Sequence, residues 1–267
     1  MSQEIKYTID SLKNLNDLNK TATLSIVSFG NCAETNLSIR LIKKMAQDWN
    51  IKVNEINIPS DSEIYTVNGY LYDLYCDKNL DGVALLPPFN ASMDKETITN
   101  IINKIRPEQN VCGYLQNKTT YYLPIREEGI IRFLNQHLTV NGKFVSILVE
   151  NYDEGQILSH LLNRLGATTV VINDKTTYLM CKSLIKQSDI VISMMNVPNF
   201  LNENMIKPGS IVLDCGIKIV KGKLMGDMKP SEDTNPGYYL SEPNAINELA
   251  IAVLLSNVRK TYEKYRN

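Results

Sequence analysis

The chain has 267 residues and a formal net charge of −1 at pH 7, with 43% apolar and 21% charged residues. This length supports two domains with ordinary cores, and the small charge excludes a global field that would draw the protein to nucleic acid or to an anionic membrane. The N-terminus lacks the apolar core of a signal peptide and no stretch approaches about 20 apolar residues, so we expect a cytoplasmic protein with reduced thiols. Five widely spaced cysteines without a Cys-x-x-Cys pair, and only two histidines, predict no metal site.

Apolar runs alternate with helical patterns along the first half, which is typical of βαβ units and a parallel sheet. The expected strands are 23–29, 52–58 and 82–86, and the expected helices are 34–49, 63–77 and 94–105. The segment 106–124 has no clear period and is expected to cross between domains.

A second set of alternations follows, so the whole chain is predicted to have an α/β fold. The expected strands are 144–149, 168–172, 189–193 and 210–214, and the expected helices are 127–137, 155–165, 176–187 and 244–265. The last of these helices has its apolar positions on one face.

The segment Val197–Asp227 carries the most specific pattern of the chain, VPNFLNENMIKPGSIVLDCGIKIVKGKLMGD. It resembles the C-terminal part of the dinucleotide domain in the methylenetetrahydrofolate dehydrogenase/cyclohydrolase family (FolD). There, a Gly-x-Pro-x-Phe-Ile turn, a Trp-Ile-Lys-x-Gly-Ala edge, a Val-Ile-Asp-Val-Gly-Ile strand and a Val-Gly-Asp-Val segment follow in this order.

This resemblance implies two α/β domains around a cleft, the second of them Rossmann-like with a parallel sheet. It implies an N-terminal folate-type domain over residues 1–120, completed by a C-terminal helix at 244–267, and a dinucleotide-type domain over residues 121–243. It also implies NADP or NAD as the cofactor, a small-molecule ligand, and a homodimer through the dinucleotide-type domains.

The proton relay that the resemblance implies is substituted. The family's Ser-x-x-Tyr-Val-x-x-Lys helix is matched by TNLSIRLI, which places Ser38 at the tyrosine and Ile42 at the catalytic lysine. Isoleucine has no titratable group and cannot transfer a proton. Lys43 is adjacent, but one helical residue rotates a side chain by about 100°. We interpret Lys43 and Lys44 as a solvated helix face, and a shifted register is the alternative.

Two further positions differ from the family's substrate site. Leu86 stands where the family has a glutamine that meets the lysine, and Cys112 stands where an aspartate grips the pterin. A thiol cannot give the charge-assisted contact that a carboxylate gives to a pterin-like donor pair. Cys112 is either a redox or nucleophilic residue or, as we favour, a small packing residue.

The phosphate-binding turn implied by the resemblance is also altered. The family's Gly-x-Ser-x-x-Val-Gly becomes VENYDEG, so that Val149 replaces the first glycine, Asn151 replaces the serine, and Gly155 survives. Three carboxylates fall near the expected pyrophosphate: Glu150, Asp153 and Glu154. Like charge there repels a dinucleotide. Alternatively, the acids cap the following helix and interact with its dipole.

The remaining candidate positions lie on the next strand, the last strand and the lid. Asp174 could bind the two hydroxyls of an unphosphorylated ribose, and Gly216 belongs to the matched strand and its turn. The family's glycine-rich lid, Pro-Gly-Gly-Val-Gly-Pro-Met-Thr, becomes PNAINELA, which begins at Pro243 and contains Ile246. The residues expected to line a substrate cleft are Ser38, Cys112, Pro243 and Ile246.

Framework residues therefore match the family while the positions of its chemistry differ. We favour a divergent member that has lost the usual catalysis and acts as a binding or regulatory protein, or on a changed small ligand. One alternative is an active NAD(P)-dependent methylenetetrahydrofolate dehydrogenase/cyclohydrolase with a substituted proton relay. Another is an NAD-dependent oxidoreductase that acts on another substrate.

Overall fold

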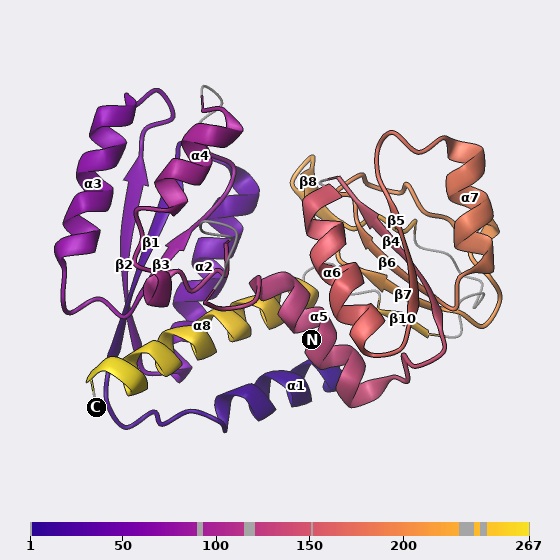
Figure 1. Cartoon of the computed structure of the whole chain (residues 1–267), viewed down its shortest axis with the longest axis horizontal. Coiled ribbons are helices and arrows are strands. Elements are labelled where there is room, and N and C mark those ends of the chain that lie inside the picture. The colour runs from indigo at the N-terminus through magenta and orange to yellow at the C-terminus, as the bar shows by residue number, and fades with distance from the viewer. Residues whose placement is uncertain are drawn as a thin grey trace. The chain divides into compact units, whose positions relative to one another are not determined.

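The computed structural model describes residues 2–89, 93–114, 121–150, 152–229, 238–240 and 245–266, with the backbone alone at residues 238 and 239. The chain divides into two units (Figure 1). Unit 1 comprises Met1–Thr8 and Ile130–Asn247, and unit 2 comprises Ile9–Gly129 and Glu248–Asn267. Helices that run across these boundaries are α1 (Gln3–Lys13), α5 (Ile125–His137) and α8 (Ala245–Arg266).

Unit 2 is built on a parallel sheet, which in its described residues has the strand order β2-β1-β3. Its elements are β1 (Ala22–Phe29), α2 (Ala33–Asp48), β2 (Ile51–Ile58), α3 (Ile64–Cys76), β3 (Gly82–Leu85), α4 (Lys95–Ile102) and the 3-10 turn η1 (Pro107–Gln109). The central strand β1 is buried along nearly its whole length, as its apolar sequence predicts.

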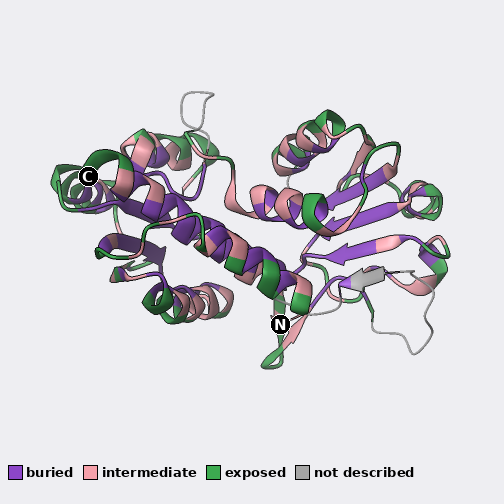
Figure 2. Ribbon diagram, turned by 90° about the horizontal axis from the view of Figure 1, so that it is seen from below, coloured by how far each residue is buried: buried purple, intermediate pink, exposed green. Residues whose placement is uncertain are grey.

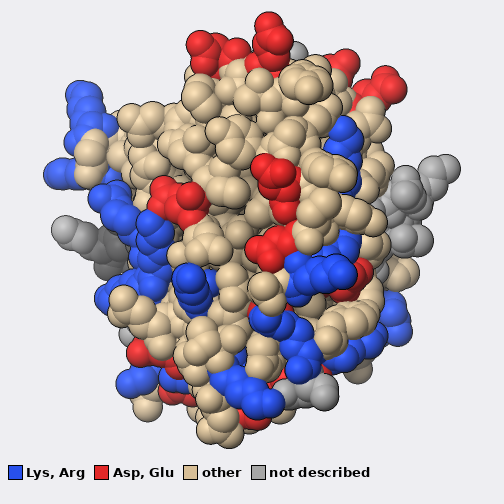
Figure 3. All heavy atoms as spheres, turned by 90° about the vertical axis from the view of Figure 1, so that its left-hand side faces the viewer, with Lys and Arg blue, Asp and Glu red and all other residues tan. Residues whose placement is uncertain are grey.

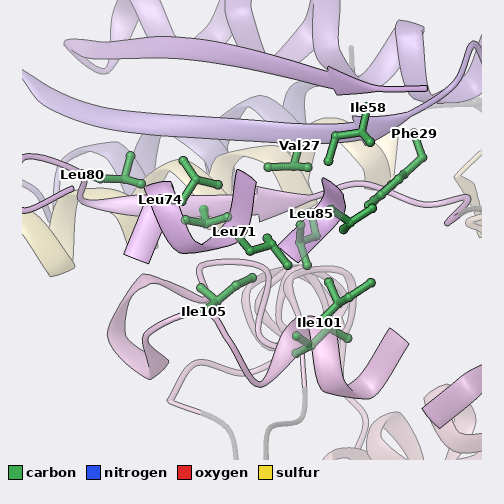
Figure 4. Close-up of a cluster of buried hydrophobic side chains, with 12 residues drawn as sticks. Val27, Phe29, Ile58, Leu71, Leu74, Leu80, Leu85, Ile101 and Ile105 are labelled. Atoms are coloured by element: carbon green, nitrogen blue, oxygen red, sulfur yellow. The ribbon is translucent and has the colours of Figure 1, made fainter. Parts of the chain in front are cut away.

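The main core of unit 2 joins its sheet to α3 and α4. Val27 and Phe29 of β1 and Leu85 of β3 pack with Leu71 of α3 and Ile101 of α4, as Figure 4 shows. These strand residues alternate with Ile26 and Ser28, whose side chains therefore point to the opposite face of the sheet.

The C-terminal helix α8 supplies a large buried part of unit 2. Asn257 donates a hydrogen bond from Nδ2 to the carbonyl of Val111 at 3.1 Å. The fully buried Arg259 donates from Nη1 to the carbonyl of Lys20 at 2.6 Å, and its guanidinium lies over the ring of Tyr262. These contacts tie the last helix to segments far away in the sequence.

Unit 1 is built on a parallel sheet whose strands, in its described residues, have the order β10-β7-β6-β4-β5. Its elements are β4 (Phe144–Val149), α6 (Tyr152–Arg164), β5 (Thr168–Ile172), α7 (Tyr178–Gln187), β6 (Ile190–Met194), the 3-10 turn η2 (Glu203–Met205), β7 (Ile211–Asp214), the antiparallel hairpin β8 (Lys218–Val220) and β9 (Lys223–Met225), and β10 (Tyr238–Leu240). Taken in chain order within the unit, this is the doubly wound 2-1-3-4-5 arrangement, a parallel sheet of the kind that the Rossmann-like resemblance implies.

The helices of unit 1 cover both faces of its sheet. Leu148 and Ile172 pack with Cys181 and Ile185 of α7, which places α7 on one face. Gly155 of α6 lies against Val149 and Val171, which point to the other face by strand alternation. β4, β6 and β7 are buried almost throughout, and Figure 2 shows this burial along the central strands.

In the parts of the chain that the structure describes, no helix is both long enough and apolar enough to cross a membrane. In the same residues, no group of three or more His, Cys, Asp or Glu side chains is arranged to hold a metal ion.

Candidate functional site

Ile42 lies in the core of unit 2. It is 2% exposed and belongs to the buried face of α2, together with Thr35, Ile39 and Ala46. Their three- and four-residue spacings put these side chains on one side of the helix. The position that the resemblance assigns to a catalytic lysine is therefore an apolar packing position without a proton donor or acceptor.

The two neighbouring lysines lie on the other side of α2. Lys43 makes an ion pair through Nζ with the Oε2 atom of Glu55 on β2, and its side chain is 46% exposed. Lys44 is also exposed. The interpretation of both lysines as a solvated helix face is confirmed.

Leu86 and Cys112 are buried near the end of β3. Leu86 is 9% exposed and donates its backbone N–H to the carbonyl of Val27 at 2.9 Å. Cys112 is 4% exposed, with its Sγ atom 3.9 Å from the carbonyl oxygen of Leu85. Burial raises the pKa of the Cys112 thiol to about 12. Ser38 is partly exposed. At neutral pH, none of the side chains of Ser38, Leu86 and Cys112 therefore carries a charge.

Aromatic side chains pack at the carboxyl end of β1 and beyond β3. Phe89 makes edge-to-face contacts with Phe29 and Tyr114, at centroid distances of 5.8 and 6.4 Å. The Tyr114 hydroxyl donates to the carbonyl of Leu85 at 3.0 Å. Ligands of open α/β sheets bind outside the carboxyl ends of the strands, and here aromatic packing shapes that edge. Phe29, Phe89 and Tyr114 are far apart in the chain, so no local sequence pattern predicts this contact.

The chain order of the unit 1 sheet reverses between β4 and β6, which is where doubly wound sheets bind ligands. β4 ends at Val149, which is fully buried. A Cβ atom on Gly155 would lie 2.9 Å from Cγ2 of Val149 and 2.6 Å from Cγ1 of Val171. Gly155 thus allows α6 to pack closely on the sheet, while the Val149 side chain fills the space beside it.

The N-terminal end of α6 is acidic. The helix begins at Tyr152, three residues before the predicted start. Gly155 thus lies inside the first turn, where it packs closely against the sheet. Asp153 and Glu154 therefore lie in that first turn, where the helix dipole favours carboxylates. Glu150, just after β4, is exposed, and Asn151 lies outside the described residues.

The other candidate positions are divided between surface and core. Asp174 forms an exposed ion pair with Lys175, with 2.7 Å between Oδ2 and Nζ. Ile246, in the first turn of α8, is 3% exposed. Pro243 lies outside the described residues.

Two buried carboxylates, Asp214 and Asp227, organise the turns at the carboxyl end of the unit 1 sheet. We call this pair the aspartate clasp. Asp227 accepts hydrogen bonds from Ser193 Oγ at 2.6 Å and from the backbone N–H groups of Met195 and Val197, both at 2.8 Å. Ser193 was missed at the sequence level, although a serine inside the apolar strand IVISM is a usable signal.

The other half of the aspartate clasp binds backbone groups. Asp214 accepts from the N–H groups of Asp227 and Met228, both at 2.9 Å, and of Gly216 at 3.1 Å. Burial raises the pKa of both carboxyl groups of the clasp, and these hydrogen bonds oppose that shift.

The glycines beside the aspartate clasp are required by packing. A Cβ atom on Gly216 would lie 2.2 Å from Oδ1 of Asp227, and one on Gly226 would lie 2.2 Å from Oδ2 of Asp214. The matched motif around Gly216 therefore has a structural explanation in which no ligand takes part.

Residues 124–266 match the family model described as "Tetrahydrofolate dehydrogenase/cyclohydrolase, NAD(P)-binding domain". The chain belongs to the tetrahydrofolate dehydrogenase/cyclohydrolase family. Among its relatives, the bifunctional protein FolD of Clostridium tetani is 28% identical over 233 residues, covering 84% of this chain and 81% of that protein. The bifunctional protein FolD of Aquifex aeolicus is 26% identical over 272 residues, covering 98% of this chain and 91% of that protein.

Solved structures of FolD proteins share the fold. The bifunctional enzyme FolD of Campylobacter jejuni superposes with a TM-score of 0.83 at 21% identity, covering 97% of this chain and 96% of that chain. The FolD of Trypanosoma brucei, solved with NADP cofactor and inhibitor, gives a TM-score of 0.85 at 19% identity, covering 97% and 95% of the two chains. The predicted two-domain α/β fold of this FolD-family chain is confirmed.

The NAD(P) that this family's description implies does not fit the residues at the turn after β4. A glycine at the first position of that turn lets the backbone approach a pyrophosphate, whereas Val149 places a buried isopropyl group there. The first turn of α6 already carries Asp153 and Glu154 at the dipole end that would receive the phosphates.

We expect the Cys112 thiol of this FolD-family chain to resist alkylation. With a pKa raised to about 12, only about one thiol in 10,000 is ionised at pH 8, and the thiolate is the reactive form. Native protein treated with iodoacetamide should therefore be modified at the exposed Cys76 and remain unmodified at Cys112, as read by peptide mass spectrometry. Modification of both at similar rates in folded protein would contradict the packing assignment and favour a reactive cysteine.

Proposed function

We propose that this chain is a FolD-family protein without the usual dehydrogenase and cyclohydrolase catalysis, and that it acts as a binding or regulatory protein or on a changed small ligand. The observation that carries this proposal is the burial of Ile42, at 2% exposure, in the core face of α2. Hydration and opening of a folate iminium need a group that moves a proton. Isoleucine has none, and the adjacent Lys43 is paired with Glu55 on the exposed face.

The altered pterin position supports the same proposal. Cys112 keeps its proton at neutral pH because its pKa is raised to about 12. A neutral, buried thiol whose Sγ atom lies near the Leu85 carbonyl gives no bidentate anchor for a pterin amino edge. Both the proton-moving group and the orienting carboxylate are thus absent at the positions that the resemblance assigns to them.

The decisive experiment is hydrolysis of methenyltetrahydrofolate by purified protein, followed by absorbance. We expect a rate no higher than the uncatalysed one, with the methylenetetrahydrofolate dehydrogenase/cyclohydrolase FolD of Campylobacter jejuni assayed in parallel as the positive control. Turnover well above background would overturn the proposal. In that case, loss of turnover in Lys43→Met but not in Lys44→Met would establish a substituted proton relay.

We also expect poor dinucleotide affinity, because Val149 replaces the glycine that lets the backbone approach a pyrophosphate and because the first turn of α6 carries two carboxylates. Separate calorimetric titrations with NADP and NAD should show dissociation constants weaker than about 100 μM, which corresponds to less than about 5.5 kcal/mol of binding free energy. Low-micromolar binding of either would contradict this. If NAD binds more tightly than NADP and Asp174→Asn removes the difference, the NAD-dependent alternative gains support.

A further inference from the structure

A hollow of about 550 Å³ lies on unit 1 between α7, at the right of Figure 1, and the segment that follows β6. Its lining residues are Tyr178 and Lys182 of α7, four residues of the segment 199–204, and Lys229, two residues beyond Asp227. This volume falls within the range of about 300–1,000 Å³ that is usual for small-molecule sites. No described residue that the resemblance assigns to the dinucleotide lines the hollow, so it is a separate feature of the unit.

The walls of the hollow are fixed to the core of unit 1. Leu201 donates its N–H to the carbonyl of Asp227 at 2.9 Å, and Lys229 donates its N–H to the carbonyl of Leu201 at 2.8 Å. Leu201 and Met228 are buried in the same hydrophobic cluster as Cys181 of α7. The backbone on both sides of the hollow is therefore held by buried contacts, and the hollow is formed before any ligand binds.

The two lysines of the hollow are not paired with acids. Among the residues that the structure describes, neither the Lys182 nor the Lys229 ammonium group has a hydrogen-bond or ion-pair partner. Lys207, by contrast, is paired with Asp189 at 2.6 Å. Charges of both signs also lie side by side over the lower half of the face shown in Figure 3. Two unpaired ammonium groups at one hollow attract an anion that contacts both of them.

The uncharged groups of the lining favour a phosphate. The side chains of Asn199, Asn202 and Asn204 line the hollow. The Oδ1 atom of Asn202 already accepts the Asn204 N–H at 3.1 Å, so the Nδ2 group of Asn202 remains to donate. The Tyr178 phenol is a further donor. A phosphate monoester carries nearly two negative charges at pH 7 and three acceptor oxygens, which matches two lysines and these donors better than a single carboxylate does.

We propose that this hollow binds a small organic phosphate, whose phosphate group contacts Lys182 and Lys229 and whose organic part donates a hydroxyl hydrogen bond to Glu203. Glu203 is the one acid among the lining residues that the structure describes, and it repels a ligand that is anionic throughout. Sugar phosphates combine a dianionic group with hydroxyl donors. The inference is independent of the proposed loss of catalysis, because it uses none of the substituted positions.

Calorimetric titration with ribose 5-phosphate tests the class of ligand, with glycerol 3-phosphate, inorganic phosphate and ribose titrated in parallel. We expect ribose 5-phosphate to bind at low salt with a dissociation constant below about 1 mM, and more tightly than inorganic phosphate. Ribose alone should give no heat of binding. Failure of all three phosphates to bind below this limit, or equal affinity for ribose and its phosphate, would overturn the proposal.

Matched lysine variants locate the binding. Lys182→Met and Lys229→Met should each weaken the binding of ribose 5-phosphate about tenfold, as expected for the loss of one charge-assisted hydrogen bond. Lys186→Met, one turn further along α7 and outside the lining of this hollow, should change the affinity less than about twofold. Equal urea midpoints would confirm that the variants fold. Equal weakening by all three variants would indicate non-specific attraction to basic groups, and weakening by Lys175→Met alone would place the phosphate at the end of β5. Either result would refute the site.

Discussion

Restoring the family's residues at Ser38→Tyr, Ile42→Lys, Leu86→Gln and Cys112→Asp together should lower the free energy of unfolding by about 5 kcal/mol or more and leave the protein inactive on folates. The reason is burial, because three of the four positions are at most 9% exposed. A lysine at position 42 would carry an unpaired amine into the core, which costs several kcal/mol or depresses its pKa. Urea unfolding measures the loss, and a methenyltetrahydrofolate assay measures the activity.

The control for this variant uses the same helix. Gln47→Lys adds a lysine to the exposed face of α2 and should change the free energy of unfolding by less than about 0.5 kcal/mol. A fourfold variant that is as stable as the parent and turns over a folate would show that only the chemical groups had been lost. The proposed loss of catalysis would then be a matter of four side chains and not of altered packing.

Asp227→Ala should be the most damaging single substitution in unit 1, with a loss of about 3–5 kcal/mol in the free energy of unfolding. It would leave the Ser193 hydroxyl and the N–H groups of Met195 and Val197 without their acceptor. Each unsatisfied buried polar group costs about 1–3 kcal/mol. Urea unfolding should show the effect. Asp174→Ala, which removes an exposed carboxylate, is the control and should cost less than 1 kcal/mol. A similar small loss in both variants would contradict the role of the aspartate clasp.

Much of the fold could be predicted from the sequence because buried parallel strands have continuous apolar sequences. The predicted strands 144–149 and 168–172 coincide with β4 and β5 residue for residue. The hairpin of β8 and β9 was not anticipated, since its strands have three residues each and include exposed lysines. The sequence signal for this hairpin was the Lys221-Gly222 pair between the two strands. In the structure both residues have positive φ angles, as a two-residue hairpin turn requires. Helix α1 was also not assigned.

The candidate site could be predicted in part. The i, i+4 pattern of α2 was sufficient to place Lys43 away from the position of Ile42, because the rotation per residue in a helix is fixed. The contact of Val149 with Gly155 and the bond from Ser193 to Asp227 join residues that are distant in sequence or that differ in element type. No local pattern encodes such pairs.

The discontinuity of unit 2 has a consequence for the nascent chain. Its core includes α8, whose Asn257 and Arg259 bind the segments around Val111 and Lys20, yet the ribosome must add residues 130–247 before this helix exists. At about 5–20 residues per second, that interval lasts about 6–24 s. Throughout it, the surface that α8 will cover is open to chaperones and proteases. Yield in the cell therefore depends on protecting the incomplete unit 2 during translation, and slow codons in the middle of the message would lengthen that exposure.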